Sequence, residues 1–311
     1  MIDPMKDFAA TAMLRVVRLG LQREGLAAAA PTAATGALVP LQDKRQLLET
    51  LLQRHGPALL LRLGEAVHDA ADEPTLTALT AARSAPELVE RWQRLERFVH
   101  SRHRVVTLAS GPTGCTLRHV SLRSGEAPTL AEDLLVFGLL VGLLHRIGTD
   151  DLRARFVGDR GWRQRDGLWE AGPVPMEAAT WELAWRQAAV QPVPAAWLTD
   201  VATPEAARAA LAADCAAPWT LPRLGHALGL APRTLQRRLR EAGTSFSSLW
   251  TEVRLARSAR LLMGGREPSA QVGYLCGFAD QAHFTRSFKR FTAMTPTVYR
   301  AQFGMAAAAT N

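Results

Sequence analysis

A pattern of helix, glycine turn and helix occurs twice near the C-terminus, and it constrains the fold more than any other feature. In the first copy, Gly229 ends one short helix and Ala231-Pro232 begins the next. In the second copy, Gly277 is the turn and Asp280 is the expected N-cap, 49 residues after Ala231. Counted from the two caps, apolar residues recur at +4 and +8 and arginine at +6: Leu235 and Phe284, Leu239 and Phe288, Arg237 and Arg286.

This repeat predicts two helix-turn-helix subdomains, each with a second helix that buries one face and exposes the other. In the first subdomain the exposed face carries Arg233, Gln236 and Arg237. These residue types hydrogen-bond base edges and phosphates. A long helix over 245–262 joins the subdomains, and helices over about 203–214 and 221–228 precede them.

The joining helix has its own expected pattern of burial. We expect these side chains on its buried side: Phe246, Leu249, Trp250, Val253 and Ala256. We expect three arginines on its exposed side, where a solvated face is favoured over phosphate contact: Arg254, Arg257 and Arg260. Cys276, beside the second turn, is expected to be packed in the core.

Charge is distributed unevenly along the 311 residues, a length typical of about two domains. Residues 221–303 hold 13 basic and 4 acidic residues, and the rest of the chain holds 24 basic and 25 acidic residues. Only three of the 37 basic residues are lysines, and the arginine fork suits phosphates and guanine edges. The sequence therefore predicts a basic C-terminal module with a polyanionic partner, attached to a neutral N-terminal body.

Two segments give this module a specific resemblance. They are APRTLQRRLREAGTSFSSLWTEVRLARSARLL (231–262) and YLCGFADQAHFTRSFKRFTAMTPTVYR (274–300), the second with a GF turn, F-x-R-x-F-K-R, T-x-M-T-P and YR. Over roughly 200–303, the chain resembles the AraC/XylS-type bacterial transcription regulators. The resemblance implies a seven-helix DNA-binding unit whose two recognition helices enter successive major grooves about 34 Å apart.

The same resemblance assigns site residues by position. Base contacts are implied for Arg233, Gln236, Arg237, Gln281, Ala282, His283 and Arg286, and phosphate contacts for Lys289 and Arg290. Ala282 can offer only packing, for example against a thymine methyl group. His283 is expected to contact DNA rather than to serve as a core or capping residue. The chain departs from the family pattern at Ala231 (usually Ser), Ser269 (usually aliphatic), Gly273 (usually Ala) and Ala293 (usually Gly).

The N-terminal body is expected to be a mixed α/β domain with a small sheet. Helical spacings occur around 47–63 and 86–102, hairpin signals over 105–122, an apolar helix over 129–147 and a strand over 152–157. It more weakly resembles the arabinose-binding-like effector domain of one AraC-type subgroup, at LRLGEAV (61–67) and ELVERWQRLERFVHSRH (87–103). Residues 160–198 are expected to form the irregular end of this domain and the connection to the C-terminal module. Within them, Trp181 and Trp185 are four residues apart and could share a helix face, and we expect them to be core residues rather than a ligand-stacking pair.

Two glycines and two histidines in this body allow sharper interpretations. Gly138 and Gly142 form a GxxxG in an apolar run of 11 residues, where close packing is favoured over membrane dimerisation. His100 and His103 form an HxxH on an expected helix and would suit a metal. Because no third ligand lies nearby in the sequence, a solvated basic face is favoured and no metal or other cofactor is expected.

The sequence argues against several other classes of protein. Three isolated cysteines (Cys115, Cys215 and Cys276) form neither a disulfide framework nor a zinc module, which fits a reducing cytosol. No signal peptide or membrane span is evident, and no GxSxG, Walker or GxGxxG motif is present. A DNA-repair methyl acceptor fused to an AraC-type module would need a cysteine-based zinc site. An architectural DNA-binding protein without an effector is the alternative that stays open.

We therefore expect a cytoplasmic, sequence-specific transcriptional regulator and no enzymatic activity. The expected organisation is an effector or dimerisation domain over 1–198, a DNA-binding domain over 199–303 and a tail over 304–311. The expected partners are double-stranded DNA, RNA polymerase, an unidentified small-molecule effector and a second copy of the chain in a homodimer. The sequence identifies neither the effector nor the target promoters, and it does not distinguish an activator from a repressor.

Overall fold

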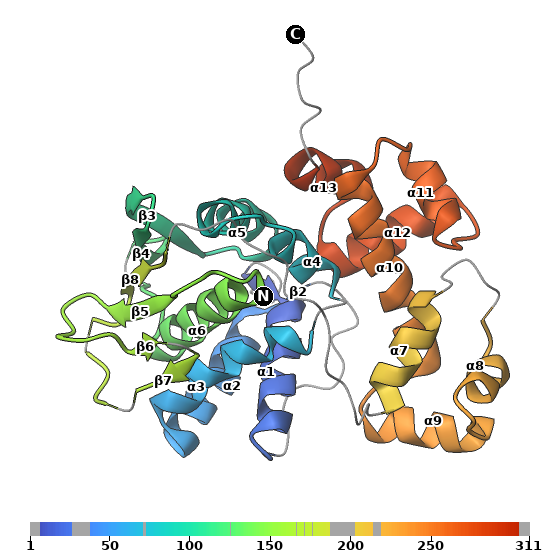
Figure 1. The fold of residues 1–311 in the computed structure, drawn as a ribbon, viewed down its shortest axis with the longest axis horizontal. Coiled ribbons are helices and arrows are strands. Elements are labelled where there is room, and N and C mark those ends of the chain that lie inside the picture. The colour runs from blue at the N-terminus through green and yellow to red at the C-terminus, as the bar shows by residue number, and fades with distance from the viewer. Residues whose placement is uncertain are drawn as a thin grey trace, which may run out of the picture. The chain divides into compact units, whose positions relative to one another are not determined.

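The computed structural model describes residues 7–26, 38–70, 73–124, 126–165, 167–170, 172–175, 177–186, 203–213 and 219–304. The chain divides into two compact units, residues 1–71 with 79–193 and residues 72–78 with 194–311. Several features named in the sequence analysis lie outside the described residues: the expected boundary at 198/199, the tail after 304, Trp197 and Cys215. Figure 1 shows a mixed α/β N-terminal unit and an all-α C-terminal unit, which is the predicted fold class.

The N-terminal unit contains a six-stranded antiparallel sheet in the order β3-β4-β8-β5-β6-β7. The strands are β3 (His103–Gly111), β4 (Gly114–Ser121), β5 (Arg153–Phe156), β6 (Gln164–Arg165), β7 (Leu168–Trp169) and β8 (Thr180–Ala184). The hairpin expected over 105–122 is β3 and β4, paired from His103↔Ser121 to Gly111↔Gly114. A separate two-stranded sheet pairs β1 (Phe8–Ala10) with β2 (Leu38–Pro40), and neither strand was expected from the sequence.

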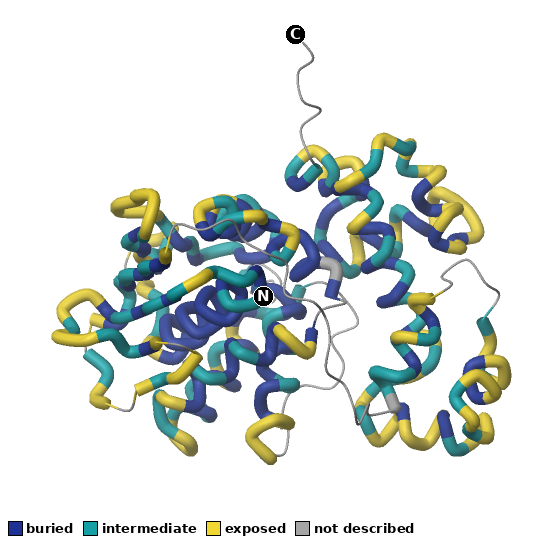
Figure 2. Tube along the Cα trace, viewed as in Figure 1, coloured by how far each residue is buried: buried dark blue, intermediate teal, exposed yellow. Residues whose placement is uncertain are grey.

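The apolar α6 (Leu130–Arg146) is at the centre of this unit (Figure 1). The other helices of this unit are α1 (Thr11–Arg23), α2 (Leu41–His55), α3 (Pro57–Leu63), η1 (Gly64–His68) and α5 (Ala85–Val99). Helix α4 (Pro74–Thr80) crosses the boundary between the two units at residues 78/79. Helix α6 packs against α2, α3 and η1 and against strands β5 and β8. Thr129 caps α6 and forms a capping box with Glu132. Nearly all of α6 is buried, as Figure 2 shows, and Phe137 stacks on Trp181 of β8 at 5.3 Å between ring centroids.

The two glycines of the GxxxG allow α6 to approach its neighbours at backbone distance. A Cβ added at Gly138 would overlap the Leu61 carbonyl, and one added at Gly142 would overlap the Gly64 carbonyl. Both acceptors belong to the α3–η1 segment, so small residues are required where these backbones meet. This confirms the close-packing interpretation of the motif.

Two expectations for the N-terminal unit were wrong. Trp181 lies on strand β8 and Trp185 directly follows it, so the pair does not share a helix face, although both side chains are buried core residues as expected. The region 160–198 is not simply irregular, because β8 lies between β4 and β5 in the sheet. Local sequence could not indicate this, since pairing between β8 and β4 joins residues more than 60 positions apart.

In the described part of the chain after residue 200, the C-terminal unit contains seven helices. They are α7 (Thr203–Ala213), α8 (Leu221–Ala227), α9 (Pro232–Glu241), α10 (Phe246–Gly264), α11 (Ser269–Leu275), α12 (Gln281–Thr292) and α13 (Pro296–Phe303). Hydroxyl or carboxylate caps begin four of them, at Thr220, Ser245, Asp280 and Thr295. Gly229 and Gly277 have φ of 65° and 74°, which explains why glycine stands at both turns.

Each helix-turn-helix subdomain has its own apolar core. In the first, Leu235 and Leu239 pack with residues of α7, α8 and α10, including Leu249 and Val253. In the second, Phe284 and Phe288 are fully buried, and Phe288 meets Tyr299 of α13 edge to face at 5.1 Å. The predicted +4 and +8 apolar positions therefore form the buried faces of α9 and α12.

Candidate nucleic-acid interface

The first recognition helix, α9, exposes the three side chains expected to contact bases. Arg233, Gln236 and Arg237 are all exposed, because the opposite face is held in the core by Leu235 and Leu239. Arg237 donates to Glu241 Oε1 at 2.8 Å, one turn along the helix. An exposed pair of this kind contributes only about 0.3–0.5 kcal/mol, so Arg237 can exchange it for a base or a phosphate at little cost.

The second recognition helix, α12, exposes its expected contacts in the same way. These residues all lie on its solvent side: Gln281, Ala282, His283, Arg286, Lys289 and Arg290. Asp280 accepts from the His283 amide at 2.6 Å, which fixes the start of the helix. The His283 ring meets Phe278 edge to face at 5.5 Å, so packing orients it while it stays exposed.

The joining helix differs from the expected burial at two arginines and two aromatic residues. Phe246 and Trp250 are only partly buried, although they pack on the first core. Arg260 is exposed and Arg257 is half-buried. Arg254 is not a solvated side chain, because its Nε donates to the Cys276 carbonyl at 2.9 Å. Cys276 itself is fully buried, as expected.

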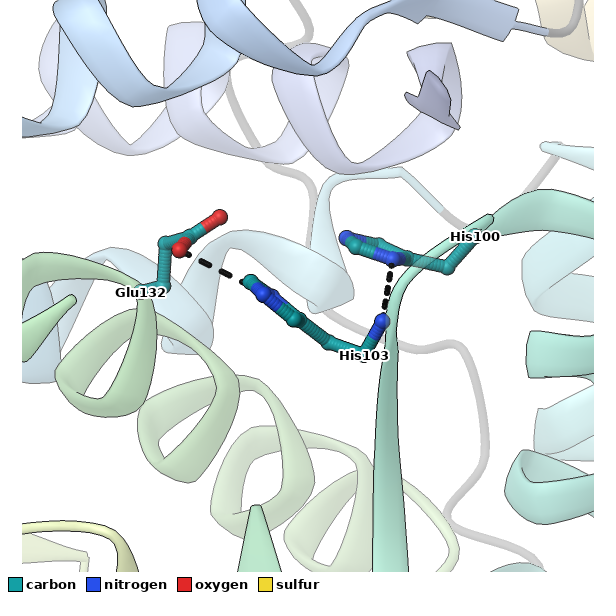
Figure 3. Close-up of side chains that lie close together, drawn as sticks. All are labelled: His100, His103 and Glu132. Carbon is teal, nitrogen blue, oxygen red and sulfur yellow. Dashed lines mark hydrogen bonds and ion pairs between the residues drawn. The ribbon is translucent and has the colours of Figure 1, made fainter. Parts of the chain in front are cut away.

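The histidine pair in the N-terminal unit contradicts the sequence interpretation. Helix α5 ends at Val99, so His100 directly follows it and His103 is the first residue of β3, and neither lies on a helix. Both rings are buried and stack with centroids 5.0 Å apart, so they do not form a solvated basic face. Glu132 of α6 lies beside them, as Figure 3 shows, and the three residues offer ligand-type atoms within 4.8 Å of one another. Sequence reasoning missed this third residue because it is 29 positions from His103.

Two cationic side chains already contact this group. Lys44 Nζ lies 2.8 Å from Glu132 Oε1 and 3.2 Å from His100 Nε2, and Arg45 Nε donates to Glu132 Oε2 at 3.1 Å. His100 Nδ1 accepts from the His103 amide at 3.0 Å, which leaves only Nε2 to face inward. The lysine amino group therefore occupies the place that a metal ion would take between His100 and Glu132. A metal would have to displace Lys44, and the geometry fits a buried ion-pair cluster better than a metal centre.

Burial and charge shift the pKa values in this cluster in opposite directions. For Glu132, burial favours the neutral form, but Lys44 and His103 outweigh it and bring the pKa to about 2. Burial lowers the pKa of His103 and of His119 to about 3. Burial, and then the Glu132 charge, raise the pKa of Asp133 to about 8, and Asp133 Oδ1 lies 2.8 Å from His119 Nδ1.

Comparison with known proteins gives matches to the C-terminal helices. Residues 224–302 match a family described as a helix-turn-helix domain. The HTH-type transcriptional regulator GadX of Escherichia coli O6:H1 (strain CFT073) is 37% identical over 82 residues, 26% of this chain and 30% of that protein. The urease operon transcriptional activator of Escherichia coli is 36% identical over 84 residues, 27% of this chain and 28% of that protein.

A solved structure also aligns with this region. A DNA-binding transcriptional dual regulator from Escherichia coli K-12 has 29% identity and a TM-score of 0.33, covering 33% of this chain and 99% of that chain. The chain spans about 30% of the length of the curated relatives that it matches. The matches to the family model and to the curated relatives confirm the AraC/XylS-type resemblance of the C-terminal helix-turn-helix region.

Proposed function

We propose that this chain is a sequence-specific DNA-binding transcriptional regulator whose C-terminal unit reads two successive major grooves. The observation that carries the proposal is the pair of recognition helices, α9 and α12, each with a buried apolar face and an exposed face of base-reading residue types. The basic residues of this unit supply the attraction for phosphates. The relatives that match this region are named a transcriptional regulator and a transcriptional activator, which supports the proposal.

The proposal gives each exposed residue a role. Arg233, Gln236 and Arg237 of α9 contact bases, as do Gln281, His283 and Arg286 of α12, with Ala282 packing on a base. Lys289 and Arg290 contact phosphates near the end of α12. These assignments follow the residue types and their exposure.

The neutral N-terminal unit has a separate role in the proposal. Residues 1–198 bind a small effector, dimerise, or both, and shift how residues 199–303 meet DNA, with 304–311 as a tail. The protein acts in the cytoplasm with RNA polymerase and without catalysis. None of the helices in the described part of the chain combines the length and apolar composition that a bilayer-crossing segment requires.

In-vitro selection of random duplex DNA by the full-length protein tests the proposal. We expect enrichment of a motif with two half-sites about one helical turn apart. General binding without a motif, and with a steep loss of affinity in salt, would overturn the proposal and favour the architectural alternative. A repeat with residues 200–311 asks whether the N-terminal unit restrains DNA binding.

Alanine substitution at Arg286 then separates base reading from phosphate contact. We expect Arg286→Ala to cost about 1–3 kcal/mol on the selected site and to relax the preference at one base position. Arg237→Ala is expected to act likewise in the other half-site. Lys289→Ala is the matched control, with a uniform loss on all sequences and a shallower salt dependence. An equal loss on random DNA for Arg286→Ala would reassign that residue to the phosphates.

A further inference from the structure

We infer that Arg254 is a positioning residue that fixes the second recognition helix relative to the first and so sets the spacing of DNA half-sites that the protein accepts. This inference rests on the proposed function. Arg254 lies on α10, the helix that joins the two helix-turn-helix subdomains, and it is half-buried. Its contacts connect the core of the first subdomain to the turn of the second.

The first contact is with the backbone of the second turn. Arg254 Nε donates to the carbonyl of Cys276, the residue that caps the end of α11, at 2.9 Å. The last carbonyls of a helix have no partner within the helix, and a guanidinium at that end also complements the helix dipole. This bond therefore holds the turn of the second subdomain directly against α10.

The second contact is with aromatic rings on both sides of the joint. The guanidinium carbon lies 3.9 Å from the ring centre of Phe278 and 5.4 Å from that of Trp250. Such cation–π contacts are strongest when the cation is partly desolvated, as it is here. Only a planar guanidinium can lie flat on a ring and donate in its own plane, so lysine does not replace arginine at this site.

Each of these two rings also contacts one recognition helix or the core that holds it. Phe278 contacts His283 and Phe284 of α12, with ring centroids 5.5 Å and 5.0 Å away. On the other side, Trp250 packs on the apolar core that includes Leu235 and Leu239 of α9. One side chain thus stands in a continuous series of contacts between the two helices that are proposed to read DNA.

A second arginine ties the same joint at a different place. Arg300 of α13 donates to the carbonyls of Leu262 at 3.2 Å and Glu267 at 2.6 Å. Leu262 is near the end of α10 and Glu267 follows that helix, so Arg300 holds the chain between α10 and α11. Loss of Arg254 should therefore loosen the orientation of the second recognition helix without separating the two subdomains.

The test is the dependence of affinity on half-site spacing, measured with full-length protein by fluorescence anisotropy. The duplexes carry the selected site with zero, one or two base pairs inserted or removed between the half-sites. Two base pairs rotate one groove relative to the other by roughly 70°. We expect the wild-type protein to lose about tenfold or more in affinity at the wrong spacings, a loss typical of a lost base contact. For Arg254→Ala we expect a flatter profile, with at most about a threefold spread.

Two further variants keep the inference falsifiable. Arg257→Ala removes the same charge one turn along α10, and we expect it to keep the wild-type spacing profile even if its overall affinity falls. Arg254→Lys keeps the charge without the planar group, and we expect its profile to resemble that of Arg254→Ala. A variant that is partly unfolded would bind less at every spacing but would keep the shape of the profile.

The outcomes separate this inference from the proposed function. If the wild-type protein selects no bipartite site, the proposed function fails. If it selects one, and Arg254→Ala keeps the wild-type preference for spacing, the positioning role is wrong and the function stands. A flattened profile in Arg254→Lys as well as Arg254→Ala supports the guanidinium as the element that sets the spacing.

Discussion

At the scale of single residues, the end of α12 contains a backbone conformation that its side chain does not favour. Ala293 follows the helix with φ of 62° in the left-handed region. Glycine is the usual residue there, because a Cβ in this conformation costs about 1–2 kcal/mol. Alanine in place of the usual glycine at position 293 therefore introduces local backbone strain next to α12.

Replacing Ala293 by glycine should remove that strain. We expect Ala293→Gly to stabilise the protein by up to about 1 kcal/mol, the strain relieved less the extra chain entropy of glycine. Urea unfolding followed by circular dichroism measures the effect. Ala242→Gly is the matched control, because Ala242 ends α9 with φ of −81° and gains nothing from glycine. A loss of stability in both variants would mean that the left-handed geometry at 293 carries no strain.

A second residue-scale prediction concerns the buried carboxylate Glu132. The Glu132→Gln change leaves the Lys44 amino group buried without its charged partner, and we expect it to cost about 3–5 kcal/mol. The double variant Lys44→Met/Glu132→Gln removes that unpaired charge and should lose clearly less than the sum of the two single variants. Urea unfolding of the wild type, Lys44→Met, Glu132→Gln and the double variant completes the cycle, and simple additivity would refute a strong Lys44–Glu132 coupling.

At the scale of elements, the contact between α6 and the α3–η1 segment depends on glycine. Gly138→Ala places a methyl group against the Leu61 carbonyl, and we expect a loss of about 1–3 kcal/mol or more, because backbone cannot move aside as a side chain can. Gly264→Ala is the control, since its added Cβ at the end of α10 meets nothing within 4 Å. That variant should be neutral or more stable by up to about 1 kcal/mol. Equal changes in stability for the two variants would show that helix propensity, and not the close approach of the backbones, determines the effect of Gly138→Ala.

Elements that depend on local signals were predictable from the sequence, and those that depend on distant pairing were not. The caps at Thr220 and Asp280 and the glycine turns act within a few residues, so α8–α9 and α11–α12 follow from the printed sequence. Strands β1, β2 and β8 have three to five residues each and form by pairing with distant segments, whereas β6 and β7 are a hairpin of two-residue strands, too short for a pattern to show. The exposed faces of α9 and α12 could be predicted from the helical spacing of their apolar residues. The hydrogen bond from Arg254 to the Cys276 carbonyl could not, because a backbone acceptor leaves no pattern in the sequence.

At the scale of the whole molecule, the two units differ in how they carry charge. The excess of basic residues belongs to 221–303, where the arginines of α9 and α12 are exposed to solvent. The N-terminal unit instead buries charged and titratable groups, among them Lys44, Glu132 and His119. Exposed charge serves attraction to a polyanion, and buried charge makes folding depend on pH. The response to acid should therefore originate in the N-terminal unit.

The buried groups set the direction of that response. Burial lowers the pKa of His103 and of His119 to about 3 and also lowers the pKa of His100, whereas an unfolded histidine has a pKa near 6.5. Below pH 6.5 the unfolded chain therefore binds more protons at these three sites, and stability decreases as the pH decreases. Burial raises the pKa of Glu96 and of Asp133 to about 8, so their neutral folded forms oppose this loss while pH falls toward 4.5. Below pH 4.5 Glu96 and Asp133 become protonated in the unfolded chain as well, so their opposing effect no longer grows. Glu132, with its pKa of about 2, then adds to the loss of stability.

Because three histidines are opposed by two carboxyl groups, we expect a gradual loss of stability as the pH falls from 6.5 to 4.5 and a steeper loss below 4.5. The measurement is the urea midpoint followed by tryptophan fluorescence, because Trp92, Trp181 and Trp185 are buried in this unit. The His119→Gln variant should show a shallower acid limb, by up to about 1.4 kcal/mol per pH unit, since one proton difference is removed. Exchange of an exposed histidine, His226→Gln, should leave the limb unchanged. An acid limb of equal slope in wild type and His119→Gln would show that this buried histidine does not drive the loss.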